Sequence, residues 1–344
     1  MATFGVLTGG GDCPGLNAVI RAVVRRGVAD GHSFVGFHGG WLGLRNDDAI
    51  ELTVENTSGL VTRGGTILGT SRTDPLADGE AGLTTLRATL EHRAIEALVV
   101  IGGDGTLCAA RDLWRQGVPL VAVPKTIDND VGGTDFTVGF HTAVQIATDA
   151  IDRLHTTAES HNRVMVVEVM GRHAGWIAGY AGMASGADMI LVPERPFDIE
   201  KVCEHLRRRH EGAHNFSIVV VAEGARAVGE PAQVSLPGDT HLRSARPPDG
   251  IGFALREQIE AFTGFDTRVT ILGYVQRGGT PVAFDRILAT RFGIAATEAM
   301  LSGRLGTMTA LHGTQVVGVA VEDALATAKP LAPDLYEAAS VFFD

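Results

Sequence analysis

The sequence has little cysteine and no long apolar run. Its three cysteines, Cys13, Cys108 and Cys203, are too widely spaced for a disulfide framework or a paired-cysteine metal site. No apolar run approaches the roughly 20 residues that a membrane-spanning helix needs. The chain opens on a strand-like run, Phe4 to Thr8, with no signal-peptide core before it. These features predict a cytoplasmic protein with reduced thiols and no membrane partner.

The chain also lacks an excess of positive charge. Its 29 Lys and Arg residues face 40 Asp and Glu residues, a formal net charge of −11. Because nucleic-acid binding depends largely on neutralising backbone phosphates, this charge argues against a nucleic-acid partner. The hydrophobic content of 45% and the charged content of 20% are ordinary for a soluble globular protein. A length of 344 residues suits two domains.

Short apolar runs with strand character alternate with helix-like runs along the chain. The runs Ala97–Ile101, Pro119–Val123 and Ile218–Val221 are continuously apolar, as expected for strands buried on both faces of a parallel sheet. This repeated alternation predicts the α/β fold class. From Gly224 to Gly250 the alternation is interrupted by four prolines, which predicts a long surface excursion.

Glycine-rich loops follow two of the predicted strands. Gly9 to Gly11 follow the first strand, and Gly102 to Thr106 follow the run that ends at Ile101. Glycines let backbone N–H groups approach a polyphosphate, and a helix N-terminus after the loop favours an anion. Asp104 adds one carboxylate suited to a magnesium ion. From the residues alone, each loop is also compatible with a plain tight turn, and Asp104 with a helix cap.

A second polar loop, from Lys125 to Asp130, follows the next strand. It holds Thr126, Asp128 and Asp130 beside the lysine. Because ligands bind at the carboxyl ends of strands in open α/β sheets, this loop and the glycine loops are expected to share one site. A phosphate cradle beside a carboxylate that can accept a proton from an alcohol predicts phosphoryl transfer to a sugar hydroxyl. Asp-Asn-Asp by itself is also a common turn sequence.

Six segments together resemble the bacterial-type 6-phosphofructokinases, in the family's order and with similar spacing from about Phe4 to beyond Gly306. They are GVLTGGGDCPGLNAVIR, RGGTILGTSR, IGGDGT, PKTIDND, VEVMGRHAGW and LGYVQRGGTPVAFDR. The resemblance implies two Rossmann-like, three-layer α/β/α domains with interleaved segments and the active site in the cleft between them. Residues 1–139 with about 275–320 would bind the phosphoryl donor, and about 140–274 with 321–344 the sugar phosphate. It also implies a homotetramer whose subunits share active sites.

The resemblance assigns chemical roles to the polar loops. Asp128 is the expected general base for the 1-hydroxyl of fructose 6-phosphate, and Asp130 orients its loop or holds water around the metal. Thr126 is expected to hydrogen-bond a transferring or sugar phosphate, and Arg172 to bridge the transferred phosphate and the substrate. Asp104 is the expected Mg²⁺ ligand.

The same resemblance implies two sets of binding residues. The donor set is Gly10, Gly11, Arg72, Gly102, Gly103, Asp104, Gly105, Thr106 and Lys125. The substrate set is Thr126, Asp128, Arg163, Met170, Gly171, Arg172, Glu223, Arg268, Tyr274 and Arg277. Arg163 and Arg268 match positions that act from a neighbouring subunit. Tyr274 departs from the histidine that many members carry, although its phenol can still donate to a phosphate oxygen.

The phosphoryl donor depends on two positions. Among the 6-phosphofructokinases that this chain resembles, glycine at position 105 accompanies ATP use. The pyrophosphate-dependent members carry aspartate at 105 and lysine at 125. This chain combines Gly105 with Lys125. An aspartate would collide with the α-phosphate of ATP and repel it, whereas lysine attracts either polyphosphate. ATP with Mg²⁺ is therefore the expected donor, and pyrophosphate is the alternative.

Other function classes share part of this pattern. NAD kinases and lipid kinases also use a Gly-Gly-Asp-Gly-Thr loop, but they lack the Thr-Ile-Asp-Asn-Asp and Met-Gly-Arg runs. A non-catalytic nucleotide-binding regulator would be expected to have lost Asp104 or Asp128, and both are present. The expected partners are therefore fructose 6-phosphate and ATP.

Overall fold

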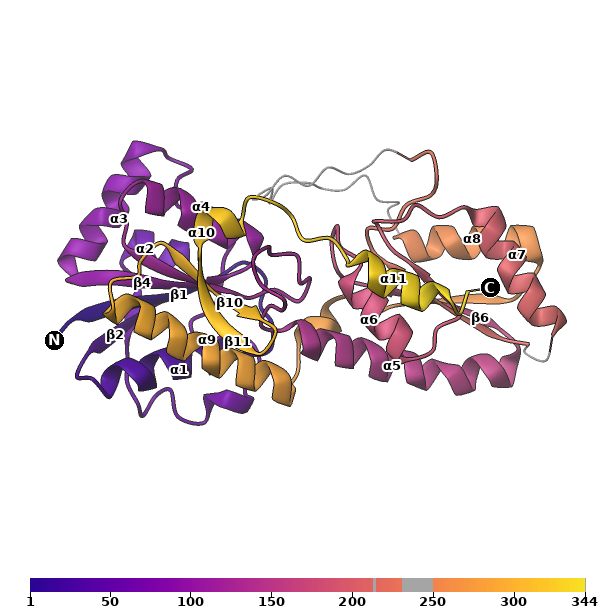
Figure 1. Ribbon diagram of the computed structural model, residues 1–344, viewed down its shortest axis with the longest axis horizontal. Helices are drawn as coiled ribbons and strands as arrows, with labels where there is room; N and C mark the ends of the chain where they lie inside the picture. Colours follow the sequence, from indigo (N-terminus) through magenta and orange to yellow (C-terminus); the bar gives the residue numbers. More distant parts are fainter. Residues whose placement is uncertain (213–214, 231–249, 344) are drawn as a thin grey trace.

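Two lobes make up the computed structural model, which describes residues 1–212, 215–230 and 250–343 (Figure 1). The N-terminus lies in one lobe and the C-terminus in the other. Most of the expected excursion between Gly224 and Gly250, residues 231–249, lies outside the described residues. No helix within the described ranges combines the length and apolar character that a bilayer crossing needs.

The first lobe is built on a seven-stranded sheet with the order β11-β10-β5-β4-β1-β2-β3. Its inner strands run parallel, and the edge strands β3 and β11 pair antiparallel with their neighbours. The strands are β1 Thr3–Gly9, β2 Ser33–Phe37, β3 Ala49–Leu52, β4 Ile95–Gly102, β5 Leu120–Pro124, β10 Thr307–His312 and β11 Gln315–Ala320.

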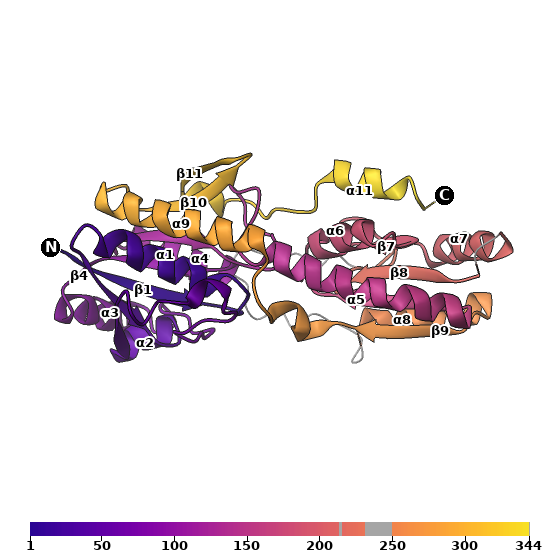
Figure 2. The same ribbon diagram turned by 90° about the horizontal axis from the view of Figure 1, so that it is seen from below.

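Helices cover both faces of this sheet. On one face α1 (Leu16–Val28) packs beside α9 (Ala283–Leu301), as Figure 2 shows. The opposite face holds α2, α3 and α4, whose buried side chains form a second apolar cluster. These are α2 Trp41–Asn46, α3 Glu80–His92 and α4 Asp104–Arg115, with the short 3-10 helix η1 at Leu60–Thr62. Because both faces are covered, β4 and β5 are apolar and buried along nearly their whole length.

The second lobe holds a four-stranded parallel sheet with the order β7-β8-β6-β9. Helices α5 and α6 pack on one face and α7 and α8 on the other. The strands are β6 Val164–Val169, β7 Met189–Leu191, β8 Ser217–Ala222 and β9 Thr267–Ile271. The helices are α5 Phe140–His161, α6 Trp176–Ala184, α7 Ile199–Glu211 and α8 Ile251–Thr263. The predicted α/β class with two layered domains is confirmed.

The chain passes between the lobes more than once. Helix α5 carries it into the second lobe, and the segment from η2 (Gly273–Arg277) to α9 carries it back. Helix α10 (Val321–Ala324) still packs against α4 and β10, whereas α11 (Pro333–Ser340) packs against α6 and β7. The last crossing therefore follows Ala324, slightly later than the expected boundary at 320.

A buried carboxylate holds the first of these crossings in place. Asp285 of α9 accepts hydrogen bonds from the backbone N–H of Gly139 at 3.0 Å and from Thr142, through its N–H at 2.7 Å and its hydroxyl at 2.6 Å. These donors belong to the first turn of α5, whose N–H groups have no partner within the helix. Asp285 therefore acts as a helix cap supplied by a distant part of the chain.

Asp285→Ala should destabilise the protein by about 3 kcal/mol, because it leaves the buried donors at the start of α5 without an acceptor. Asp285→Asn keeps one acceptor oxygen and should lose about half as much. Urea unfolding followed by circular dichroism measures both variants. Equal stability of Asp285→Ala and the wild type would contradict the capping role.

Candidate active site

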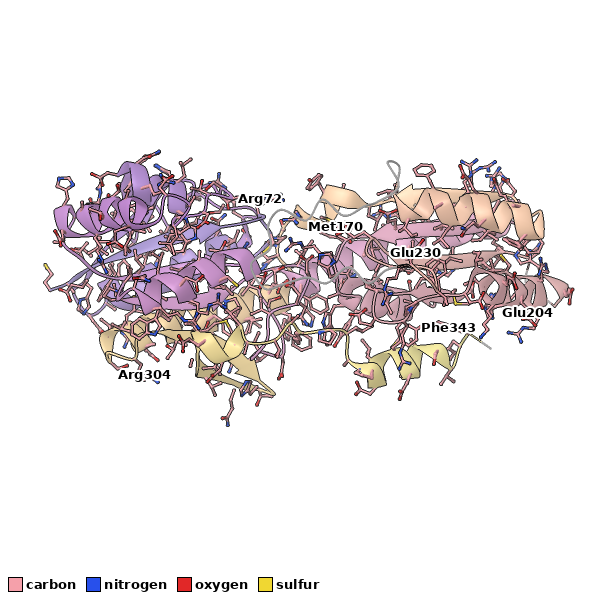
Figure 3. The ribbon with its side chains drawn as sticks, turned by 90° about the horizontal axis from the view of Figure 1, so that it is seen from above. Arg72, Met170, Glu204, Glu230, Arg304 and Phe343 are labelled. Atoms are coloured by element: carbon pink, nitrogen blue, oxygen red, sulfur yellow. The ribbon has the colours of Figure 1, made fainter. Side chains whose placement is uncertain are left out.

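The carboxyl ends of parallel strands from both sheets open onto one cavity of about 590 Å³. Gly10 follows β1, Gly103 follows β4 and Lys125 follows β5, while Met170 follows β6 and Glu223 follows β8. Ligands bind at this end of the strands in open α/β sheets, and here two sheets contribute. In Figure 3 the labelled side chains Arg72 and Met170 lie where the two lobes meet.

Most of the predicted site residues line this cavity. Those that do are Gly10, Gly11, Arg72, Gly103, Asp104, Gly105, Thr106, Lys125, Thr126, Asp128, Asp130, Met170, Arg172, Glu223, Tyr274 and Arg277. Four predicted residues, Gly102, Gly171, Arg163 and Arg268, do not line it.

The glycine loops are shaped by close packing as well as by access to a ligand. A Cβ atom on Gly11 would lie 1.5 Å from Nη1 of Arg277, so the glycine makes room for that arginine. A Cβ on Gly102 would lie 2.3 Å from Cβ of Thr106. Gly102 is therefore a packing position beneath the loop. Helix α4 begins at Asp104, so the last three residues of the predicted loop form its first turn, whose N–H groups suit a phosphate.

Lys125 is buried inside the site, with 2% of its surface exposed. Its Nζ donates to the carbonyl oxygen of Gly9 at 3.0 Å and to that of Gly11. Burial lowers the pKa of the ammonium group from its ordinary value. Lys125 thus holds the first glycine loop against the end of β5. An ammonium group has three N–H donors, and these two bonds use two of them.

The Thr126–Asp130 loop is held in a sharp turn by its own neighbours. Asn129 adopts a left-handed conformation with φ of 51°, which asparagine tolerates better than most residues. Its Oδ1 accepts from the N–H of Thr137 at 3.1 Å, and its Nδ2 donates to the carbonyl of Asp135 at 3.3 Å. The hydroxyl of Thr137 donates to the carbonyl of Thr126 at 2.7 Å. With Asn129 held in this way, the side chains of Asp128 and Asp130 both line the cavity.

The two acids of this loop, Asp128 and Asp130, both have raised pKa values. Burial raises the pKa of Asp128 above its ordinary value, and Arg277 and Arg172 oppose that shift while Glu223 adds to it. Burial, followed by the charges of Asp128 and Asp104, raises the pKa of Asp130 to about 7. The Oδ1 atom of each acid has no hydrogen-bond partner among the described residues. Such shifts are typical of carboxylates that act on a ligand.

The carboxylates also fit a magnesium ion. Asp104 and Asp130 line the same cavity, and the buried Oδ1 of Asp130 has no protein partner within the described ranges. No group of three or more His, Cys, Asp or Glu side chains placed to hold a metal occurs in the described part of the chain. Magnesium commonly uses only one or two carboxylates and completes its coordination with water and substrate phosphates.

The second lobe contributes the turn after β6 to the cavity. Gly171 has φ of 138° and Arg172 has φ of 52°, both positive values that side chains other than glycine rarely adopt. The N–H of Arg172 donates to Oε1 of Glu223 at 2.8 Å. A Cβ on Gly224 would lie 2.0 Å from the carbonyl oxygen of Arg172. Gly171 and Gly224 therefore allow the turn to place Arg172 and Glu223 at the cavity together.

Arg163 and Arg268 lie at the opposite end of the second sheet. Arg163 precedes β6, and Arg268 is near the start of β9. Both pair with Asp266, Arg163 through its Nε at 2.6 Å. Neither guanidinium reaches the cavity of the same chain.

Part of the cavity wall is formed by residues to which no sequence motif assigned a role. The additional lining residues are Asp12, Trp41, Ser71, Thr73, Asp74, Leu76, Cys108, Ala109, Arg111, Asp112, Ile127 and His173. Cys108 and Arg111 stand four and seven residues after Asp104, so helical spacing along α4 was a usable signal. Trp41 carried no such signal, because its place depends on how α2 packs against the sheet.

A sequence model of the family described as Phosphofructokinase matches residues 3–300. The chain belongs to the phosphofructokinase family. It is 53% identical over 340 residues to the pyrophosphate--fructose 6-phosphate 1-phosphotransferase of Amycolatopsis methanolica, covering 98% of this chain and 99% of that one. It is 49% identical over 349 residues to the ATP-dependent 6-phosphofructokinase of Mycobacterium leprae, covering 99% of each. The family match confirms the predicted resemblance and sets aside the NAD and lipid kinases.

Solved structures of phosphofructokinases share the fold. The phosphofructokinase from Saccharomyces cerevisiae superposes with a TM-score of 0.84 and 30% identity. The match covers 100% of this chain and 47% of the yeast chain, so this chain spans about half of that larger protein. A pyrophosphate-dependent phosphofructokinase from Nitrosospira multiformis gives a TM-score of 0.85 at 20% identity, over 96% of this chain and 86% of that one. At that identity the likeness shows the fold alone.

Asp130→Asn should stabilise the ligand-free protein at pH 8. A carboxyl whose pKa is raised to about 7 in the folded state binds more protons there than in the unfolded chain, so the free energy of unfolding falls as pH rises toward 7. Asparagine cannot ionise, so this loss of stability does not occur in the variant. Its free energy of unfolding at pH 8 should exceed that of the wild type by about 1–3 kcal/mol. The gain should shrink at pH 5, where the wild-type acid is protonated.

Urea unfolding at pH 5 and pH 8 measures the difference. Glu204→Gln, which neutralises an exposed carboxylate on α7, serves as the control and should show no such pH-dependent gain. A stability difference that is the same at both pH values would contradict the raised pKa of Asp130.

Proposed function

We propose that this phosphofructokinase transfers the γ-phosphoryl group of ATP to the 1-hydroxyl of fructose 6-phosphate, giving fructose 1,6-bisphosphate. The relatives named above are divided between ATP and pyrophosphate, so the choice of donor rests on this chain's own site. The observation that carries the choice is Gly105, which lines the cavity without a side chain. The α-phosphate of ATP would need that space.

The extent of the cavity supports a nucleotide donor. Beyond the glycine loops its wall includes Trp41, Leu76 and Ala109, which add aromatic and apolar surface. The indole Nε1 of Trp41 is buried and has no hydrogen-bond partner among the described residues. A nucleoside offers a flat apolar face to such a wall, whereas pyrophosphate offers only charged oxygen atoms. Arg72 and Arg111 add positive charge for the phosphates on this side.

Pyrophosphate is the second candidate donor, because the pyrophosphate-dependent members that this chain resembles also carry lysine at position 125. The buried ammonium group of Lys125 lies against the first glycine loop, where it would attract either polyphosphate. The Amycolatopsis methanolica relative also carries a pyrophosphate name. Glycine at position 105 does not exclude this donor.

Asp128 would accept the proton of the attacking hydroxyl. Its carboxylate is buried, and the positive charges of Arg277 and Arg172 stabilise its ionised form. Arg172 would also stabilise negative charge on the phosphoryl group as it moves, and Thr126 would hydrogen-bond a phosphate oxygen. A bound Mg²⁺, held by Asp104 with Asp130 beside it, would neutralise charge on the donor phosphates.

The 6-phosphate of the sugar would need further positive charge. Within one subunit Arg277 lines the cavity, and the ring of Tyr274 lies 6.0 Å from its guanidinium carbon. We assign Arg163 and Arg268 to the same phosphate in a neighbouring subunit, because they match family positions that act across subunits and do not line the cavity of their own chain. This assignment requires a homo-oligomer, and we propose a cytoplasmic tetramer. The first lobe would bind ATP, and the second would bind the sugar phosphate through Met170, Gly171, Arg172 and Glu223.

The wild type should turn over with MgATP and poorly with pyrophosphate. Gly105→Asp should abolish ATP use, because two unit charges about 4 Å apart repel by roughly 4 kcal/mol at an effective dielectric constant of 20. That repulsion corresponds to close to three orders of magnitude in binding or rate. Since Lys125 is already present, the variant should gain weak pyrophosphate activity.

Initial rates with each donor, on both proteins, measure this. The matched control is Ala88→Asp, which adds the same charge on the exposed face of helix α3, outside the cavity. Preference of the wild type for pyrophosphate would contradict the proposed donor, and full ATP activity in Gly105→Asp would show that Gly105 does not determine the choice.

Asp128→Asn should lower kcat by at least about 100-fold while substrate binding is kept, because the amide has nearly the same shape but cannot take the proton.

Arg163→Ala should weaken binding of fructose 6-phosphate. If sites are shared between subunits, mixing the two variants under exchange conditions should restore part of the activity.

Hybrid oligomers are separated by charge or by tag before the assay. Turnover of Asp128→Asn within a few-fold of the wild type would refute the general base. Isolated hybrids with no recovered activity would refute the shared site.

A further inference from the structure

The crossing between α10 and α11, residues 325–332, contacts the Thr126–Asp130 loop, which we call the catalytic loop. We call the crossing itself the tail strap. It is the thin yellow segment that joins the two lobes in Figure 1. Leu325 and Leu331 anchor its ends, each with 3% of its surface exposed. Leu325 packs in a cluster of the first lobe and Leu331 in the cluster that includes α6. Between these anchors lies Lys329, one of only three lysines in the chain.

The backbone of Lys329 joins one catalytic segment to the other. Its N–H donates to the carbonyl oxygen of Asp130 at 3.2 Å, on the loop that carries the two acids. Its carbonyl oxygen accepts from Nε1 of Trp176 at 3.1 Å. Trp176 begins α6, four residues after Arg172. A single residue of the tail strap thus contacts segments that belong to different lobes.

The ammonium group of Lys329 makes the same connection. Its Nζ donates to the carbonyl oxygen of Asp135, which also accepts from Nδ2 of Asn129. It lies 4.8 Å from the centroid of the Trp176 ring and 5.8 Å from that of Phe136, within range of a cation–π interaction. Burial lowers the pKa of this ammonium group to about 8. The charge therefore lies between the left-handed turn of the catalytic loop and the start of α6.

A neighbouring contact holds the turn after β6 to the tail strap. Oε1 of Glu194 accepts from the N–H of Leu331 at 2.8 Å and from the N–H of Gly175 at 3.0 Å. Behind the acids, a small cavity of about 90 Å³ is lined by Asp104, Asp130 and Lys329 among others. The tail strap therefore closes the side of the acids that faces away from the main cavity.

We propose that Lys329 is a positioning residue for phosphoryl transfer. It holds the Asp128–Asp130 loop of one lobe and the Arg172–Trp176 turn of the other in one relative arrangement. The general base, Asp128, and the arginine that bridges the phosphate, Arg172, then face the same substrate. The proposal rests on the proposed roles of Asp128 and Arg172. A displacement of reacting groups by about 1 Å can cost 100-fold in rate, so a residue outside the main cavity can limit turnover in this way.

Lys329→Met keeps most of the side-chain volume but loses the donor and the charge, and it should lower kcat by about 10- to 100-fold. The KM values for fructose 6-phosphate and for the donor should stay within about threefold, since neither ligand contacts the residue. Lys329→Arg keeps a cation over the Trp176 ring and should recover most of the lost kcat. Lys201→Met, an exposed lysine on α7, is the matched control and should behave as the wild type.

The decisive measurement repeats Lys329→Met in the Asp128→Asn background. If Lys329 acts by placing the base, its loss should cost less than about threefold once the base is gone. A purely structural role would lower the residual activity by the same factor as in the wild type. Equal losses in both backgrounds, or a Lys329→Met enzyme as active as Lys201→Met, would overturn the proposal.

Urea unfolding first establishes that each variant is folded. If Lys329→Met does not fold, Trp176→Phe decides, because it removes the hydrogen bond to the Lys329 carbonyl and keeps an aromatic ring. It should lower kcat several-fold in the wild type and much less beside Asp128→Asn, and an unchanged kcat would overturn the proposal. Assays use whichever donor the wild type accepts. A wild type inactive with both ATP and pyrophosphate would instead refute the proposed function.

Discussion

The burial of charge where the carboxyl ends of parallel strands from two sheets meet is the constraint on which the rest of the molecule depends. Lys125 and Asp128 are almost fully buried there. A buried charge is tolerated only where opposite charges or hydrogen bonds compensate it. For Asp128 that compensation comes from Arg172, after β6, and from Arg277, after β9. The electrostatics of the catalytic loop therefore depend on parts of the chain that lie beyond it.

The same constraint explains where the backbone departs from its preferred conformations. Asn129 and Arg172 both have positive φ, and each lies in a turn that brings a charged side chain to the cavity. Such conformations persist where surrounding contacts hold them, and they concentrate at functional sites. Here the contacts are side chain to backbone: Asn129 with Thr137, and Glu223 with Arg172. Stability is lost locally, and a fixed arrangement of acids and cations is gained.

Sequence reasoning could predict the features that depend on local order along the chain. A buried strand followed at once by a polar loop is visible in the sequence, so Asp104, Asp128 and their neighbours were found, together with the α/β class. Trp41 and Lys329 were not found, because each reaches the site through packing between elements far apart in sequence. Gly102 was expected to contact the donor from the family resemblance, and that stays a prediction, whereas the collision of a side chain at this position with Thr106 could not be seen in the sequence.

The repeated passage of the chain between the lobes has a mechanical consequence. Helix α5, the η2–α9 segment and the tail strap are separate covalent links across one junction, and a single apolar cluster contains residues from both lobes. A protease that cut any one of these links would leave the lobes tethered by the others. Neither lobe corresponds to a continuous stretch of the gene, so no truncation yields one of them intact. Separation of the lobes at any one of these links is therefore resisted by the other two.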